Sequence, residues 1–436
     1  MTALNKPGNP FETVRPLPAL KGQIHVPGDK SMSHRALIYA ALAEGPSEIR
    51  GLLEAADVRS TWGCLVALGI PIQAGQATVK IDGQGLYGLK AATSALDCGN
   101  SGTTMRLLMG LLAGQPFASQ LIGDASLTRR PMRRIAEPLG LMGANIELRE
   151  GNFAPVQLNP AHLAGLDFAL PVASAQLKSA LLLAGLYAQD TLTLRGKIAS
   201  RDHSERMLPH YGVMLDIKSD EIRMEPGQRL QPMDFEVPGD PSTAAFWLAA
   251  AAMLPGSDLE LPGVSFNPSR LGFVRVLQRM GSKQLIPSGS GPEPQGTIHI
   301  QGNSLSATSV TAAEIPDLID EVPLIAILAT QALGRTEVRG AAELRVKESD
   351  RLEAIALNLR RMGGEIELFE DGFAIKGPQL LHGPIDEMID PMHDHRIAMA
   401  FAIAGLVAEG ETRIQDPACV AISYPQFFDI LHGLKG

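Results

Sequence analysis

Hydrophobic and polar positions recur along this chain with a long period of about seventy residues. In each period a short polar loop leads into a segment of small and apolar residues, and a segment with a single apolar stripe follows. The first kind of segment predicts a buried helix, and the second predicts an amphipathic helix with one face toward solvent. A repeat that is visible in the sequence predicts an architecture of repeated structural units. The buried helices are expected within Gly28–Gly45, Gly99–Gly114, Ala173–Gln189, Gly239–Leu254, Asp320–Gly334 and Asp394–Gly410.

Short stretches between these helices alternate in polarity and end at glycine or proline, which is typical of strands. Examples are ATVKIDG, TLTLRGK, TIHIQG and GFAIKGP. Each unit is therefore expected to run βαβαββ, with helices covering one face of each sheet. The predicted fold class is mixed α and β, in two domains of three repeated βαβαββ units each.

The chain length predicts two domains, because 436 residues exceed what one hydrophobic core usually serves. The segment PGDPS at Pro238–Ser242 repeats the segment PGDKS at Pro27–Ser31, and we expect the chain to cross between the domains at both places. Residues 1–26 and 241–436 should then form the first domain and residues 27–240 the second. The active site is expected in the cleft between them.

Composition narrows the class of protein. A hydrophobic content of 45% with 19% charged residues is typical of a globular enzyme and excludes a disordered chain. Every apolar run is shorter than the roughly 18 residues that a membrane span needs, and the first twenty residues lack the apolar core of a signal peptide. We therefore expect a cytoplasmic protein with no membrane partner. Its net charge of −9 argues against a nucleic-acid partner, and its three scattered cysteines argue against a disulfide framework or a thiolate metal site.

Cations cluster at the starts of the predicted helices, where the helix dipole favours acidic residues. A cation at that position costs a few tenths to about 1 kcal/mol, so a compensating anion is expected. A solvated or ion-paired surface residue is the alternative for each cation taken singly. Glycine, serine and threonine in the same loops supply the donors that phosphate and carboxylate oxygens accept. The cations are Lys30, Arg35, Arg106, Lys347, Arg351 and Arg396.

The segment LRVKESDRL suggests a second kind of chemistry. Ser349 is the expected N-cap of the helix that follows, so Glu348 would project from the loop between two cations. A carboxylate at an anion-binding site suits proton transfer if a second group stands opposite, and Asp320 is the candidate for that group. The alternatives are an ordinary capping ion pair for Glu348 and simple N-capping for Asp320.

Seven motifs, in order over nearly the whole chain, resemble the 5-enolpyruvylshikimate-3-phosphate synthase family. The motifs are PGDKSMSHR, GNSGTTMR, RPM, ASAQLKSALLLAG, IDEVP, LRVKESDR and DHRIAMA. The resemblance implies transfer of the enolpyruvyl group of phosphoenolpyruvate to the 5-hydroxyl of shikimate 3-phosphate, with release of phosphate and without metal or organic cofactor. It also implies two domains that close over these two small-molecule substrates, and we expect a monomer.

The resemblance also implies a role for particular residues. Asp320 and Glu348 would be the proton-transfer groups, in either order, and Lys30 would assist them. The implied ligands of shikimate 3-phosphate are Lys30, Ser31, Arg35, Ser174, Ala175, Gln176, Arg201, Asp320 and Lys347. The implied ligands of phosphoenolpyruvate are Lys30, Asn100, Gly102, Arg130, Gln176, Arg351 and Arg396.

Two positions relate this chain to branches of the family. Ile422 occupies a place where many relatives carry a lysine, so one contact of those relatives is absent or replaced. Gly102 is retained where glyphosate-tolerant relatives have alanine, which predicts that the protein is a glyphosate target. Two other functions remain open from the residues: a nucleotide-sugar enolpyruvyl transferase and a catalytically silent anion-binding protein of the same fold.

Overall fold

A computed structural model of the protein describes residues 10–285 and 293–434. These residues form two compact units. The described part of the first unit is residues 10–26, 239–285 and 294–434, and that of the second is residues 27–238 with Glu293. Residues 1–9, which the sequence places in the first domain, lie outside the described residues.

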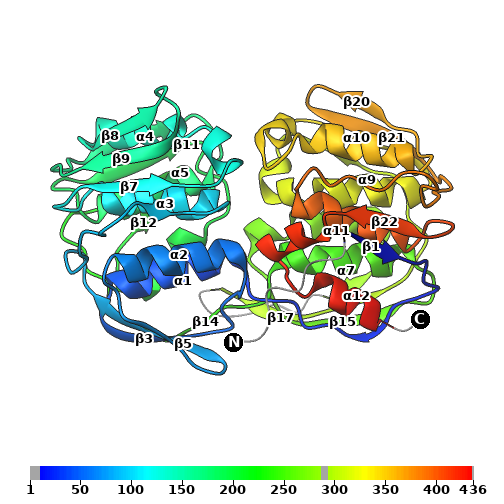
Figure 1. Cartoon of the computed structure of the whole chain (residues 1–436), viewed down its shortest axis with the longest axis horizontal. Helices are drawn as coiled ribbons and strands as arrows, with labels where there is room; N and C mark the ends of the chain where they lie inside the picture. The colour runs from blue at the N-terminus through cyan, green and yellow to red at the C-terminus, as the bar shows by residue number, and fades with distance from the viewer. Residues whose placement is uncertain (1–9, 286–292, 435–436) are drawn as a thin grey trace. The chain divides into compact units, whose positions relative to one another are not determined.

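The second unit contains three four-stranded sheets among its described residues, each built in the same way. In each sheet the strand that follows the buried helix pairs parallel with the first strand, and an amphipathic helix then leads to an antiparallel hairpin. Each repeat buries its sheet against its helices, as α1 does with β5 in Figure 1. The elements of the first repeat are β14 (Phe235–Glu236), α1 (Lys30–Leu42), β3 (Glu44–Arg50), α2 (Ala56–Ala67), β4 (Ile72–Ala74) and β5 (Thr78–Gln84). Those of the second are β6 (Leu96–Asp97), α3 (Gly102–Leu112), β7 (Ser119–Ile122), η1 (Leu127–Arg129), α4 (Arg133–Leu141), β8 (Asn145–Arg149) and β9 (Phe153–Asn159). Those of the third are β10 (Leu166–Leu170), α5 (Ala175–Gly185), β11 (Leu192–Gly196), α6 (His203–His210), β12 (Asp216–Ile217) and β13 (Glu221–Met224).

The first unit repeats this plan twice and then departs from it. Its first repeat contains β2 (Lys21–Gln23), α7 (Pro241–Met253), β15 (Asp258–Ser265), η2 (Pro268–Arg270), α8 (Gly272–Arg279), β16 (Gln284–Leu285) and β17 (Gln295–Gln301). Its second contains β18 (Ser309–Val310), η3 (Ile315–Asp317), η4 (Ile319–Glu321), α9 (Val322–Gln331), β19 (Gly334–Val338), η5 (Ala342–Val346), α10 (Arg351–Arg361), β20 (Glu367–Phe369) and β21 (Gly372–Gly377). Its third contains α11 (His395–Gly405), β22 (Thr412–Gln415), η6 (Pro417–Ile422), α12 (Phe427–Gly433) and β1 (Phe11–Val14). In this last repeat β22 pairs antiparallel with β1, so the expected hairpin after the second helix is replaced by a strand from the other end of the described chain.

Two repeats take their first strand from a distant part of the sequence. Strand β2 precedes α1 in the chain but pairs parallel with β15, next to α7. Strand β14 precedes α7 but pairs parallel with β3, next to α1. The segments PGDKS and PGDPS follow these two strands, so each marks a point where consecutive elements belong to different sheets.

The first helix of each repeat is buried on nearly all sides, as its apolar composition predicts. Helix α7 is fully buried along its length, and α3 and α5 pack so closely that a Cβ at Gly110 would lie 2.1 Å from the carbonyl oxygen of Ala180. Only glycine allows that approach, because real Cβ contacts are never so short. The second helix of each repeat keeps a solvent face, as α10 shows with its charged residues. No helix in the described residues has the length and apolar character to cross a bilayer.

Candidate active site

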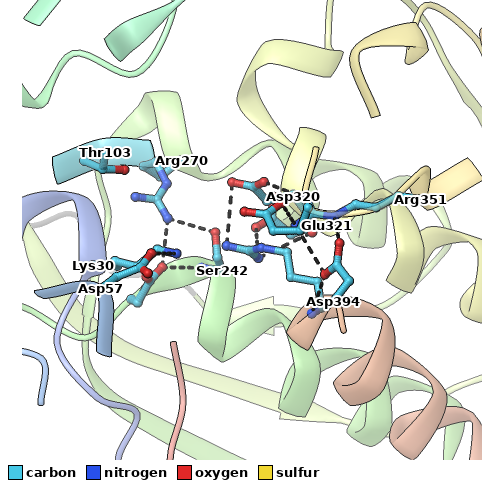
Figure 2. Close-up of polar contacts among 12 residues, drawn as sticks. Lys30, Asp57, Thr103, Ser242, Arg270, Asp320, Glu321, Arg351 and Asp394 are labelled. Carbon is cyan, nitrogen blue, oxygen red and sulfur yellow. Dashed lines mark hydrogen bonds and ion pairs between the residues drawn. The ribbon is translucent and has the colours of Figure 1, made fainter. Parts of the chain in front are cut away.

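The N-termini of the buried helices carry most of the candidate side chains. In α1, Asp29 is the N-cap and accepts a hydrogen bond from the amide of Met32 at 2.8 Å. Lys30 is then the first helical residue, and its ammonium pairs with Asp57 at 3.1 Å (Figure 2). Asp57 lies in the first turn of α2, where the helix dipole favours an acid. The lysine is thus fixed by a carboxylate from the neighbouring helix.

The loop before α3 brings together the residues around Gly102. Ser101 caps the helix, and the Asn100 amide donates to Asp124 at 2.6 Å while its oxygen accepts from Arg130 at 2.7 Å. A Cβ at Gly102 would lie 3.5 Å from a guanidinium nitrogen of Arg130 and 3.5 Å from one of Arg106. Two positive charges therefore flank a position that has no side chain.

The start of α5 joins this group through Gln176. Its side-chain oxygen accepts from Arg106 at 2.5 Å, and its amide donates to Thr103 at 3.0 Å. Ser174 is the N-cap of α5, and Ala175 is its first residue. The structure therefore places Gln176 between two residues of α3.

Arg35 is held inside the second unit by protein groups. Its side chain is 2% exposed and donates to the Ser31 carbonyl at 2.8 Å, to Ser204 at 2.9 Å and to Ser179 at 2.6 Å. Arg201 is half-buried in the connection between β11 and α6. Arg35 thus links the first turn of α1 to α5 and α6.

In the first unit, one guanidinium gathers three carboxylates. Arg351 is 1% exposed and donates to Glu348 at 2.7 Å. It also donates to Asp394 at 2.7 Å and to Asp320 at 3.2 Å, and Figure 2 shows these three residues together. Burial alone would lower the pKa of Arg351, but Asp394, Glu348 and Asp320 raise it above its usual value. The arginine is therefore permanently charged, and it fixes the orientation of both acids predicted for proton transfer.

Two further cations surround this cluster. Arg396 lies in the first turn of α11 and is 3.6 Å from the carboxylate of Asp320 and 3.8 Å from that of Glu321. Lys347 is half-buried, and burial lowers its pKa although Asp320 and Glu343 oppose the shift. The first unit thus combines an acid pair with three cations, a set of groups that can bind an anion and move a proton.

One expectation and one alternative about helix capping are wrong. The N-cap of α10 is Asp350, whose carboxylate accepts from the amide of Glu353, whereas the hydroxyl of Ser349 donates to Asp394 at 3.2 Å. Asp320 does not cap α9, because that helix begins after a 3₁₀ turn and has no side-chain cap. Both aspartate and serine are good caps, so the sequence could not decide between neighbouring residues.

Several residues of the site were not assigned roles from the sequence. Asp57 pairs with Lys30, and Asp394 pairs with Arg351. Arg106 was recognised as a cation at a helix start, but its partner Gln176 is seventy residues away. The signal that could have identified Asp57 and Asp394 is the cation-rich loops beside them, which need buried counter-charges.

Comparison with known proteins gives one consistent result. The chain matches the family model described as EPSP synthase (3-phosphoshikimate 1-carboxyvinyltransferase) over residues 14–431. It is 48% identical to the 3-phosphoshikimate 1-carboxyvinyltransferase of Syntrophomonas wolfei over 423 residues, covering 96% of this chain and 98% of the relative. It is 46% identical to the enzyme of the same name from Bacillus subtilis, covering 95% of this chain and 97% of the relative.

Solved structures agree with this match. The EPSP synthase of Acinetobacter baumannii superimposes with a TM-score of 0.84 at 40% identity, covering 97% of each chain. The enolpyruvyl transferase NikO from Streptomyces tendae superimposes with a TM-score of 0.81 at 18% identity, covering 98% of each chain. At that identity the second likeness shows only a shared fold.

Proposed function

The chain belongs to the EPSP synthase family, and we propose that it is a 3-phosphoshikimate 1-carboxyvinyltransferase in chorismate and aromatic amino-acid biosynthesis. It transfers the enolpyruvyl group of phosphoenolpyruvate to the 5-hydroxyl of shikimate 3-phosphate and releases phosphate. The observation that carries this proposal is the pair of acids on one buried guanidinium, Asp320 and Glu348 on Arg351. The nucleotide-sugar transferase is not favoured, because the close relatives all share one name.

The reaction needs two proton transfers in each half. In the addition step the 5-hydroxyl oxygen bonds to C2 of phosphoenolpyruvate, its proton leaves to a base, and an acid protonates C3. In the elimination step the bond from C2 to the phosphate oxygen breaks, the departing phosphate takes up a proton, and a second proton leaves the new methyl group as the double bond between C2 and C3 forms again. We propose that Asp320 takes the hydroxyl proton and Glu348 protonates C3, with the roles reversed on elimination.

Arg351 provides a physical route to an acidic Glu348. A carboxylate beside a guanidinium stays ionised, so Glu348 is a poor acid while Arg351 donates to it at 2.7 Å. If the carboxylate of phosphoenolpyruvate accepts hydrogen bonds from Arg351 and Arg396, it competes with Glu348 for the same donor. Glu348 then loses that charged contact and gains a second negative charge beside it, and both changes favour the protonated carboxyl that C3 needs.

The remaining candidate residues would bind the two anions. We propose that Lys30, Asn100, Gly102, Arg130 and Gln176 bind phosphoenolpyruvate beside Arg351 and Arg396. Their donors would stabilise the charge that develops on the departing phosphate. The proposed ligands of shikimate 3-phosphate are Lys30, Ser31, Arg35, Ser174, Ala175, Gln176, Arg201, Asp320 and Lys347.

These ligands come from both units, so we propose that one pair of substrates uses residues of both and draws the units together. Small-angle scattering should then show compaction when shikimate 3-phosphate and phosphoenolpyruvate are added to the purified protein. We also propose that the protein works as a monomer in the cytoplasm. Light scattering at micromolar concentration would test the first of these two statements.

The deciding experiment measures phosphate release with phosphoenolpyruvate and shikimate 3-phosphate, beside a reaction with a uridine-diphosphate amino sugar. Release with shikimate 3-phosphate alone supports the proposal, and release with neither acceptor makes the chain a silent anion-binding protein. Glu348→Gln should lower kcat about a hundredfold or more, the range typical of losing a general acid. Glu367→Gln is the control, because Glu367 pairs with Arg335 at 2.7 Å on the surface. Turnover of Glu348→Gln at the rate of that control would refute the role of Glu348.

A further inference from the structure

The second unit contains a buried ion pair close in sequence to its candidate site residues. Neither member of this pair has been assigned above as a substrate ligand or a proton-transfer group. The ammonium of Lys178 pairs with the carboxylate of Glu205, with side chains 1% and 7% exposed. Lys178 also donates to the carbonyl oxygen of Ile198 at 2.9 Å. Burying two charges costs several kcal/mol of desolvation per ion, so stability alone is a weak reason for such a pair.

The three partners belong to the segments that carry the proposed phosphate ligands. Lys178 lies in the first turn of α5, two residues after Gln176. Glu205 lies in the first turn of α6, and Ile198 lies in the connection that leads from β11 into that helix. Arg201 stands in the same connection, between Ile198 and Glu205. The ammonium group of Lys178 therefore holds the backbone before Arg201, at Ile198, and the side chain of Glu205 after it against α5.

The neighbouring residues form a second contact between the same helices. Ser179 follows Lys178 and its hydroxyl lies 2.7 Å from that of Ser204, which precedes Glu205. Arg35 donates to both hydroxyls, at 2.6 Å and 2.9 Å, and Tyr39 donates to Ser204 at 2.8 Å. Helix α1 is thus bound to the same two residues. The ion pair and the serine pair together join three of the proposed shikimate 3-phosphate-binding segments.

We propose that Lys178 and Glu205 are positioning residues that hold the connection carrying Arg201 against α5, and so set the affinity for the phosphate of the acceptor. This inference rests on the proposed function. Within the described residues the pair makes no hydrogen bond or ion pair with an assigned ligand of phosphoenolpyruvate, and it holds the connection that carries Arg201, so its effect should fall mainly on the acceptor. A backbone held by a buried charged hydrogen bond loses that restraint when the ammonium is removed, and the loss of such a bond is worth about tenfold in affinity or more.

The test compares two variants of the pair with one control. Lys178→Met removes the ammonium, and Glu205 can then take up a proton, because burial raises its pKa and the opposing effect of Lys178 is gone. Glu205→Gln keeps the shape of the pair and removes one charge, so it remains informative if Lys178→Met does not fold. The control is Gln115→Met, because Gln115 is 1% exposed in the same unit, follows the C-terminal end of α3 and donates to Leu86 and Tyr187.

The expected result is a KM for shikimate 3-phosphate raised about tenfold in Lys178→Met. The rise should be smaller in Glu205→Gln, and kcat and the KM for phosphoenolpyruvate should be unchanged in both. Gln115→Met should lower the unfolding midpoint without changing either KM. If both pair variants lose stability but keep the KM for shikimate 3-phosphate, or if the control raises it equally, the proposal is overturned.

Direct binding separates this proposal from the proposed function. Calorimetric titration with shikimate 3-phosphate reports affinity whether or not the protein turns over. A wild-type protein that binds shikimate 3-phosphate without releasing phosphate would refute the function, while weaker binding by Lys178→Met would still support the positioning role. Equal binding by wild type and both pair variants would refute the positioning role alone. Failure of the wild type to bind shikimate 3-phosphate would refute both.

Discussion

Replacing Asp394 by asparagine should destabilise the first unit by about 2–4 kcal/mol, because this carboxylate accepts from four donors. One oxygen accepts from Arg351 at 2.7 Å and from Ser349 at 3.2 Å. The other accepts from the amide of Arg396 at 2.9 Å and more weakly from Arg351 at 3.4 Å. Asparagine has the same shape but only one accepting oxygen, so its NH₂ group must face donors on one side.

The magnitude follows from what remains after the substitution. Helix capping changes little, because asparagine and aspartate are similar N-caps. The NH₂ group of the asparagine would face two buried donors, which costs about 1–3 kcal/mol. The hydrogen bonds that remain are weaker because the acceptor is no longer charged, and this adds about 1 kcal/mol. The full cost of breaking a buried ion pair, about 3–5 kcal/mol, is not reached, since Arg351 keeps Asp320 and Glu348 as partners.

The assay is urea unfolding followed by tryptophan fluorescence. Trp247 is fully buried in the first unit, and Trp62 is the other tryptophan of the chain, in the second unit. A Trp62→Phe background therefore makes the signal report the first unit alone. The matched control is Glu367→Gln, because Glu367 also accepts from an arginine at 2.7 Å but is 61% exposed.

A surface ion pair of this kind contributes about 0–1 kcal/mol. The difference between the two variants measures what burial adds to the same contact. If Asp394→Asn loses no more stability than Glu367→Gln, the buried cluster around Arg351 does not stabilise the unit and the reasoning is wrong. Phosphate release should also fall in Asp394→Asn, because Arg351 orients Asp320 and Glu348.

Three further predictions test other parts of the molecule. Gly102→Ala should fold normally, because its methyl would lie 3.5 Å from nitrogens of Arg106 and Arg130 and 3.7 Å from Leu127. Glyphosate should inhibit the wild type at micromolar concentration, and the inhibition constant of the variant should be about tenfold higher or more. Burial, with the charges of Lys30 and Arg35, lowers the pKa of His34. Neutral His34 therefore favours folding above its unfolded-state pKa of about 6.5, and this contribution to stability is lost as the pH falls. The wild type should lose stability relative to His34→Gln between about pH 6.5 and pH 5, and parallel curves of stability against pH would contradict the lowered pKa. A hydrogen bond with the neighbouring Cys64, together with burial, raises the pKa of the Cys98 thiol, and burial raises that of Cys419. Neither thiol should therefore react with iodoacetamide at pH 7.5 until urea unfolds the protein.

The repeated helices and strands could be predicted because each depends on local periodicity. Buried helices such as α7 have almost no polar residues, and amphipathic helices such as α10 have one apolar stripe. The pairing of β2 with β15 and of β14 with β3 joins residues more than 180 positions apart. The local sequence of a strand does not specify which distant strand it pairs with. The antiparallel pairing of β1 with β22 in the last repeat was missed for the same reason.

The site was predictable on its cationic side and not on its anionic side. A lysine or arginine at a helix start contradicts the dipole, so Lys30, Arg106, Arg351 and Arg396 were conspicuous. An aspartate there agrees with the dipole, so Asp394 carried no sign of its contact with Arg351 forty-three residues away. Lys178 also stands in a first helical turn but was overlooked. The residues around it in α5 are apolar, so the segment predicts only a buried core helix.

The carboxylates beside these cations also determine how substrate anions can bind. Asp57 holds Lys30 at 3.1 Å and Glu348 holds Arg351 at 2.7 Å, so both of these candidate anion-binding groups already have a protein oxygen close to them. A substrate anion must compete with that oxygen, and its binding free energy is the difference between two charged contacts. Such an exchange costs affinity, but it keeps the cations in position and frees a carboxylate when the anion binds. In the proposed reaction the freed carboxylate is Glu348. Part of the binding free energy of phosphoenolpyruvate is then used to release Glu348 from Arg351, so that Glu348 can become the acid that protonates C3.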